Sequence, residues 1–167
     1  MLPLVLNPLR LKTGLVGRGE ALARRAALLA EAGVDTRLLS SDVSDEILAP
    51  LQLLFVAGLT EGEARHLAGR ARALGVLVNV EDVPPLCDFH VPAIVRRGDL
   101  LLTASTGGTA PGLARALREH LGESFGPEWR DRLTDLAKER ARFRGQGLSP
   151  AEVSQKVRDL VVEKGWL

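Results

Sequence analysis

Carboxylates, hydroxyls and paired glycines gather in one stretch of the chain, residues 76–117. An apolar run over residues 76–80 ends in the acidic pair Glu81–Asp82, and a later apolar run opens into Ser105–Thr109, which contains two adjacent glycines. A buried strand that delivers a carboxylate at its carboxyl end is typical of sites in open α/β sheets. Glycines that precede a helix let its free N–H groups and dipole face an anion. We therefore expect a site for an anionic ligand that also holds an acid or a base.

A second glycine motif, Gly17-x-Gly19, lies near the amino terminus. An apolar strand pattern leads into Gly17, a helix pattern follows Gly19, and Val34–Leu39 has the composition of another strand. This order of strand, glycine turn, helix and strand is the context in which such a motif binds a dinucleotide.

The dinucleotide fingerprint is incomplete. Its third position favours a small residue, so that the helix can approach the sheet, and here that position is Leu22. No acidic residue falls at the end of the second strand, because Asp35 lies near its start and Asp42 beyond its end. The motif is therefore compatible with a cofactor site and equally with a purely structural tight turn.

Alternating strands and helices must position these residues. Besides the elements above, short apolar runs predict strands, and a helix pattern fills residues 63–74; the predicted strands are Leu2–Leu6, Leu51–Ala57 and Val76–Val80. Strands that alternate with helices indicate a parallel sheet. After Pro92 the pattern changes to a hairpin over residues 93–103, and a helix follows the paired glycines.

The last part of the chain predicts two amphipathic helices. The second starts at Ser149-Pro150-Ala151-Glu152, which has the spacing of a capping box. Two such helices cannot bury their apolar faces alone, so we expect them to pack on the main domain or, preferably, on a second subunit. The sequence thus predicts an α/β protein, with a Rossmann-like parallel-sheet domain followed by a small hairpin and helical dimerisation region. The expected domains are a Rossmann-like, dinucleotide-binding domain (1–92), a hairpin and helix (93–126) and a helical region (127–167).

Composition restricts the function further. A formal net charge of +1 argues against a surface for nucleic acid, and a single cysteine, Cys87, excludes an internal disulfide or a cysteine-cluster metal site. No apolar run approaches the ~20 residues of a membrane span, so we expect a cytoplasmic protein without membrane contact. No spacing resembles a dedicated zinc or calcium site.

The motifs resemble those of the precorrin-2 dehydrogenase family, the N-terminal unit of siroheme synthases. The matching segments are Leu2–Asn7, Asn79–Asp82, Phe89–Gly98, Ser105–Pro111 and Leu113–Arg115. The resemblance implies NAD-dependent oxidation of precorrin-2 to sirohydrochlorin by a homodimer. Some relatives also insert ferrous iron, and the resemblance leaves that activity open for this chain.

The family pattern also assigns residues. It implies a catalytic Asp82, and it gives a cofactor-binding set and a substrate-binding set: Gly17, Arg18, Gly19, Glu20, Ala57 and Gly58 for NAD, and His90, Ser105, Thr106, Gly107, Gly108 and Thr109 for the tetrapyrrole. No resident metal is expected. The eight carboxylates of precorrin-2 make arginines sensible partners, namely Arg96, Arg97 and Arg115.

Several alternatives remain. Asp82 in isolation is more typical of a turn cap, His90 of a packed core residue, and the Arg96–Arg97 pair of a solvated hairpin tip. Arg18 stands where the family usually has glycine, which weakens the cofactor assignment. A chelatase without dehydrogenase activity and a regulatory module that binds tetrapyrrole or nucleotide without turnover are therefore the rival functions.

Overall fold

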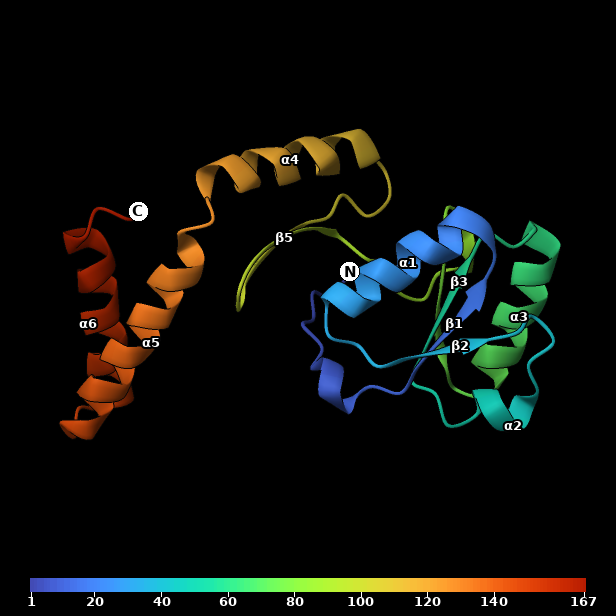
Figure 1. The fold of residues 1–167 in the computed structure, drawn as a ribbon, viewed down its shortest axis with the longest axis horizontal. Coiled ribbons are helices and arrows are strands. Elements are labelled where there is room, and N and C mark those ends of the chain that lie inside the picture. The colour runs from blue at the N-terminus through green and yellow to red at the C-terminus, as the bar shows by residue number, and fades with distance from the viewer. The chain divides into compact units, whose positions relative to one another are not determined.

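The computed structural model describes residues 1–167, which divide into two compact units, Met1–Val91 and Pro92–Leu167. The first unit contains four strands and three α-helices, and the second contains two strands and three α-helices (Figure 1). In chain order the elements are β1 (Thr13–Gly17), α1 (Gly19–Glu31), β2 (Thr36–Leu39), α2 (Asp45–Leu48), β3 (Leu53–Ala57), α3 (Glu61–Ala73), β4 (Leu77–Val80), β5 (Ala93–Arg97), β6 (Leu100–Ala104), α4 (Pro111–Ser124), α5 (Trp129–Gly145) and α6 (Pro150–Glu163). Two short 3-10 helices, Pro8–Arg10 and Pro84–Leu86, complete the list.

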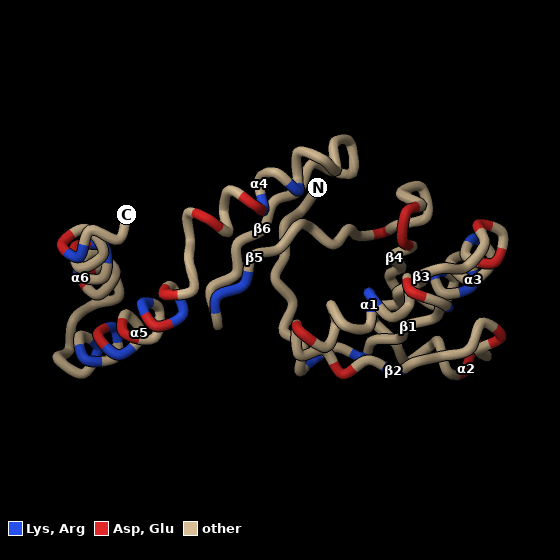
Figure 2. The backbone as a smooth tube through the Cα atoms, turned by 45° about the horizontal axis from the view of Figure 1, so that its top comes forward, with Lys and Arg blue, Asp and Glu red and all other residues tan.

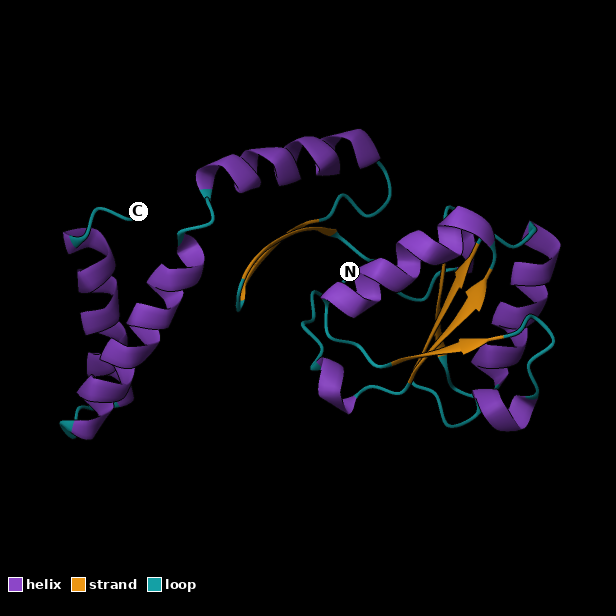
Figure 3. Cartoon of the chain, in the orientation of Figure 1, coloured by secondary structure: helices purple, strands orange, loops and turns teal.

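The first unit is built on a parallel sheet with the strand order β2-β1-β3-β4 (Figure 3). Each face of the sheet carries its own apolar cluster, because side chains alternate along a strand. Leu15 and Phe55 pack with Leu29 of α1, while Val16 and Leu54 pack with α3 on the other face. The carboxyl ends of all four strands meet at one edge, where α1 and α3 begin.

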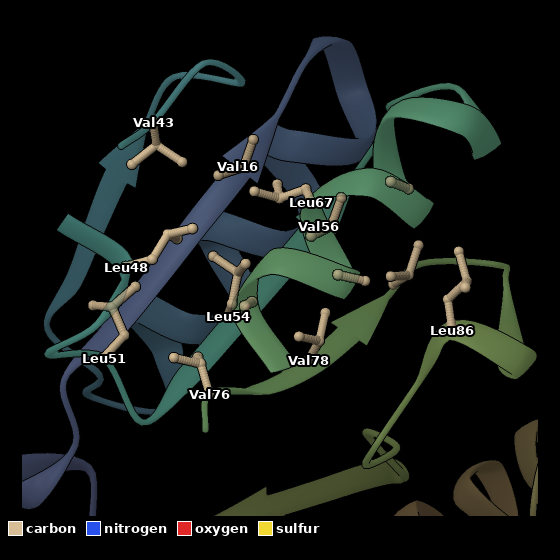
Figure 4. Packing of buried hydrophobic residues seen from close by; sticks show 14 residues of the cluster. Val16, Val43, Leu48, Leu51, Leu54, Val56, Leu67, Val76, Val78 and Leu86 are labelled. Atoms are coloured by element: carbon tan, nitrogen blue, oxygen red, sulfur yellow. The ribbon is translucent and has the colours of Figure 1, made fainter. Parts of the chain in front are cut away.

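The strand β3 lies at the centre of this core, and all five of its residues are buried. Leu54 and Val78 are fully inaccessible, and they face the buried stripe of α3 formed by Ala64, Leu67, Ala68 and Ala71 (Figure 4). Burial of a Leu or Val side chain contributes about 1.5–3 kcal/mol, so this cluster is the main source of stability for the unit.

Sequence signals at helix ends agree with the structure. Glycines 33 and 75 have φ values of 71° and 78° just past α1 and α3, where the left-handed conformation ends a helix. Ser149 and Glu152 form the predicted capping box at the start of α6. Thr60 and Glu63 form a second capping box at the start of α3.

The second unit consists of an antiparallel hairpin, β5–β6, on which α4 packs, and of the helix pair α5–α6. Trp129 and Phe143 of α5 and Val153 of α6 are buried. The guanidinium of Arg132 lies 5.0 Å from the ring centre of Trp129 and 5.2 Å from that of Trp166, which ties the chain end to α5. Figure 2 shows acidic and basic residues interspersed along α5 and α6.

The predicted α/β class, with its Rossmann-like sheet and small hairpin, is confirmed. The strand predicted at Leu2–Leu6 is wrong, because this segment has no strand partner and its side chains are exposed. The segment before Leu51 contains the short helix α2, whose Leu48 is fully buried. No helix combines the length and apolar character needed to cross a membrane.

Candidate functional site

Two loops at the carboxyl edge of the sheet touch each other through glycines. A Cβ atom on Gly17 would lie 2.1 Å from the carbonyl oxygen of Ala57, and the N–H of Arg18 donates to that oxygen at 3.1 Å. A Cβ atom on Gly58, where φ is 71°, would lie 2.4 Å from the carbonyl oxygen of Arg18. Glycine is required at both positions, and four of the predicted cofactor residues therefore lie together.

The start of α1 offers free donors beside these loops. Gly19 has a φ of 64°, and a Cβ atom built on it would meet nothing within 4 Å. Arg18, the N-cap residue, makes no side-chain capping bond, so the N–H groups of the first turn have no side-chain acceptor. Glu20 is exposed, with a carboxylate oxygen 3.7 Å from Arg24. A phosphate fits this open, positively polarised helix end.

The large residue at the third fingerprint position does not keep α1 away from the sheet. Leu22 packs into the apolar cluster between α1 and the strands. The close approach is made one residue earlier, because the methyl group of Ala21 would lie 3.2 Å from a Cβ atom on Gly58.

Arg18 has a partner that the sequence analysis missed. Its guanidinium forms an ion pair with Glu63 in the first turn of α3, which joins the loops after β1 and β3. The hydroxyl and N–H of Thr60 also donate to Glu63, at 2.7 and 2.8 Å. These bonds from Thr60, reinforced by Arg18, lower the pKa of Glu63 to about 2. The spacing Thr60-x-x-Glu63 was readable as a capping box, but the contact with Arg18 was not.

Asp82 lies at the same edge, two residues beyond the end of β4. It is exposed and is the one non-glycine residue with positive φ, at 60°. Its carboxylate makes no hydrogen bond or ion pair within the chain, so it does not cap the turn. A carboxylate held on a sharp turn and free of partners is available to accept or donate a proton.

Two arginines that the sequence patterns did not single out, Arg24 and Arg25, lie near the acidic pair Glu81–Asp82. A carboxylate oxygen of Glu81 is 3.9 Å from Arg24, and its other oxygen is buried without a partner. The guanidinium of Arg25 lies 5.4 Å from the ring centre of Phe55. Burial lowers the pKa of Arg25, while the nearby Glu81 opposes this effect. Two arginines of α1 thus face the acidic end of β4.

The predicted substrate residues are divided between the units. His90, in the first unit, is exposed and has no hydrogen-bond partner. In the second unit, Gly107 and Gly108 have φ values of 66° and 81°, and the hydroxyl oxygen of Thr106 accepts the N–H of Ala110 at 3.3 Å. Ala110 is the N-cap residue of α4 and makes no side-chain cap, so the first turn of α4 also presents free N–H groups.

The two arginines expected at the tip of the hairpin, Arg96 and Arg97, are not a fully solvated pair. The side chain of Arg97 is half-buried and donates to the carbonyl oxygens of Phe125, at 2.8 Å, and Gly122, at 3.1 Å. It therefore caps the carboxyl end of α4, where unpaired carbonyls favour a cation. Arg96 is half-buried, and Arg115 on α4 pairs with Glu119 at 3.0 Å.

A parallel sheet with a glycine turn, an open helix end and a free carboxylate at one edge defines a dinucleotide-binding protein of the Rossmann-like class. Residues 4–93 match the protein family described as putative NAD(P)-binding, and the chain belongs to that family. The resemblance predicted from the motifs is confirmed, because curated relatives are siroheme synthases.

Three of these comparisons illustrate the similarity. The chain is 35% identical over 144 residues to the siroheme synthase of Methylobacillus flagellatus, covering 74% of this chain and 31% of that protein. It is 34% identical over 177 residues to the siroheme synthase of Pseudomonas fluorescens, covering 93% of this chain and 37% of the relative. The chain spans about a third of the length of the curated relatives it matches. The solved structure of SirC, a precorrin-2 dehydrogenase, has the same fold, with a TM-score of 0.72 at 19% identity, covering 99% of this chain and 92% of SirC.

Proposed function

We propose that this protein is an NAD-dependent dehydrogenase that oxidises precorrin-2 to sirohydrochlorin. The observation that carries the proposal is the free Asp82 carboxylate at the sheet edge that also holds the Gly17–Gly19 turn. Membership of a putative NAD(P)-binding family supports the nicotinamide cofactor, and similarity to siroheme synthases supports the tetrapyrrole substrate.

The first-turn N–H groups of α1 and the open space at Gly19 fit the pyrophosphate of the cofactor. We propose NAD as the cofactor, because the family resemblance implies it and residues 4–93 match a putative NAD(P)-binding family. The ion pair of Arg18 with Glu63 keeps the arginine beside this turn, where it neutralises a bound phosphate.

The reaction removes a hydride and a proton from precorrin-2. Bound NAD supplies the hydride acceptor at the sheet edge. Asp82 accepts the proton, since its carboxylate is exposed and has no competing partner. Within the second unit, the uncapped first turn of α4, preceded by Ser105, Thr106 and Thr109, is suited to bind carboxylates. Within the first unit, His90 is exposed and has no hydrogen-bond partner. Insertion of ferrous iron into the product would require loss of pyrrole protons, for which the same Asp82 is the candidate acceptor.

We also propose that the protein acts as a homodimer through its second unit. The helix α4 has no buried residue, and Leu113 and Leu117 are 55% and 40% exposed on it. A two-stranded hairpin with one helix buries little apolar surface by itself, and a second copy would cover this face. Sedimentation of the purified protein at twice the monomer mass would support the dimer, and a monomer would contradict it.

One observation favours a rival function. Arg18 replaces a small residue in the glycine turn, and its fixed side chain is compatible with a module that binds tetrapyrrole without oxidising it. One experiment distinguishes the two functions. The protein is incubated anaerobically with precorrin-2 and NAD, and the formation of sirohydrochlorin is measured by its absorbance.

We expect product to form only when both protein and NAD are present. If the Asp82 carboxylate is the base, Asp82→Asn should lower the rate of product formation by about 100-fold or more. Glu61→Gln, which removes an exposed carboxylate of α3, is the matched control and should leave turnover unchanged. Binding of precorrin-2 without oxidation would favour the rival, and full activity of Asp82→Asn would remove this residue from the mechanism.

A further inference from the structure

The loop that carries Asp82 is closed at its base by Asp88. The N–H of Asp88 donates to the carbonyl oxygen of Val78 at 2.7 Å, and its carboxylate accepts the N–H of Val78 at 2.8 Å. The chain therefore leaves β4, makes a sharp turn at Asp82 and returns to the outer edge of the same strand. Asp88 thus satisfies backbone groups that an edge strand would otherwise expose.

Arg72 of α3 binds two groups of this loop. Its Nε atom lies 2.8 Å from a carboxylate oxygen of Asp88, and one of its terminal nitrogens donates to the carbonyl oxygen of Leu86 at 2.8 Å. Leu86 itself is buried in the apolar cluster beside α3 (Figure 4). A single guanidinium thus holds both a side chain and a backbone carbonyl of the loop, a contact that its rigid planar shape favours.

Two contacts of β4 reinforce the same closure. The amide nitrogen of the Asn79 side chain donates to the carbonyl oxygen of Phe89 at 2.9 Å. The N–H of Val80 donates to the sulfur of Cys87 at 3.3 Å, and that sulfur lies 3.1 Å from the carbonyl oxygen of Val80. The base of the loop is consequently fixed on both sides, while Asp82 at its tip has no partner of its own.

We propose that Asp88 and Arg72 are positioning residues, which hold the loop so that the Asp82 carboxylate points to the reacting atoms. The proposal rests on the proposed dehydrogenase function for its catalytic consequence. Asp82 occupies the left-handed region at φ 60°, a conformation that persists only when its surroundings impose it. Because the Asp82 side chain has no hydrogen bond or ion pair, its position depends on the backbone of the loop. That backbone is held by the bond from the Val83 N–H to the Val80 carbonyl at 3.4 Å and by the closure at Asp88. A displacement of a catalytic group by about 1 Å costs on the order of 100-fold in rate.

The chain provides a matched control for this clamp. Arg70, on the same helix, donates to Asp45 through Nε at 2.9 Å and to the carbonyl oxygen of Val43 at 2.6 Å. This pair has the same chemistry as Arg72 with Asp88, but it fastens α2 rather than the Asp82 loop. Asp45→Asn is therefore the control for Asp88→Asn, and Arg70→Lys is the control for Arg72→Lys.

The test compares turnover and loop order in these four variants and the wild type. Asp88→Asn should lower kcat for precorrin-2 oxidation by about tenfold or more, with KM for NAD changed by less than about twofold. Asp45→Asn should leave both constants at the wild-type values. Urea unfolding of each protein shows whether it is folded, and the milder Arg72→Lys variant serves if Asp88→Asn does not fold.

A second measurement does not depend on activity. Cys87 is the only cysteine and is half-buried, so a change from the wild-type rate of reaction with Ellman's reagent reports a change in the closure of this loop. Asp88→Asn and Arg72→Lys should react severalfold faster than the wild type, and the two controls should not. Equal thiol rates, or a kcat that falls equally in Asp88→Asn and Asp45→Asn, would overturn the clamp. A wild-type protein without turnover would instead refute the proposed dehydrogenase, while the thiol rates would still decide whether Asp88 closes the loop.

Discussion

Replacement of Gly19 by alanine should separate cofactor binding from folding. The added methyl group would meet no atom within 4 Å, so the only folding cost is the left-handed backbone at φ 64°. That conformation costs an alanine about 1–2 kcal/mol, and the reduced freedom of the unfolded chain returns about 0.4–1 kcal/mol. We therefore expect Gly19→Ala to lower the free energy of unfolding by about 1 kcal/mol and to remain folded.

The same methyl group stands where the dinucleotide must approach the backbone. An added methyl in a close-packed contact costs about 1–3 kcal/mol, which corresponds to an NAD affinity weaker by about fivefold to 150-fold. Gly75→Ala is the matched control, because Gly75 also has positive φ, at 78°, and open space around it, but lies past the end of α3, at the opposite end of that helix from the site. Both variants should lose similar stability in urea unfolding, and only Gly19→Ala should lose NAD binding in titration calorimetry. Equal NAD affinity in the two variants would refute the placement of the cofactor at this turn.

Two further predictions concern stability. The lowered pKa of Glu63, about 2, means that its bonds to Thr60 and Arg18 stabilise the fold above the ordinary glutamate pKa of 4.5 and that this contribution is lost as the pH falls from 4.5 towards 2. The difference in stability between wild type and Glu63→Gln should accordingly shrink over that pH range in denaturant titrations; a constant difference would contradict the assignment. Leu54→Ala should lower the free energy of unfolding by about 2–5 kcal/mol, because Leu54 is fully buried, whereas Leu38→Ala, with the side chain 64% exposed on the edge strand, should change it little.

Local patterns identified the elements of this protein well. The capping box at Ser149 and the glycines that end α1 and α3 depend on neighbours within a few residues, so their signals are contained in short segments. The buried run of β3 was equally readable, because a strand covered on both faces is continuously apolar. The segment Leu2–Leu6 shows the limit of this reasoning, since an apolar run forms a strand only if another strand is free to pair with it.

The α/β class, the glycine turn and the order of the candidate site segments could be predicted from local sequence patterns. Which of their side chains are free depends on the tertiary structure. Arg97 caps α4, Arg18 pairs with Glu63, and Asp82 has no partner, although all three are charged residues next to turns. The tertiary structure also decided that Asp88 and Arg72, separated in sequence, meet at the edge of β4. Such contacts depend on the crossing of helices and strands that are distant along the chain, and no short pattern records them.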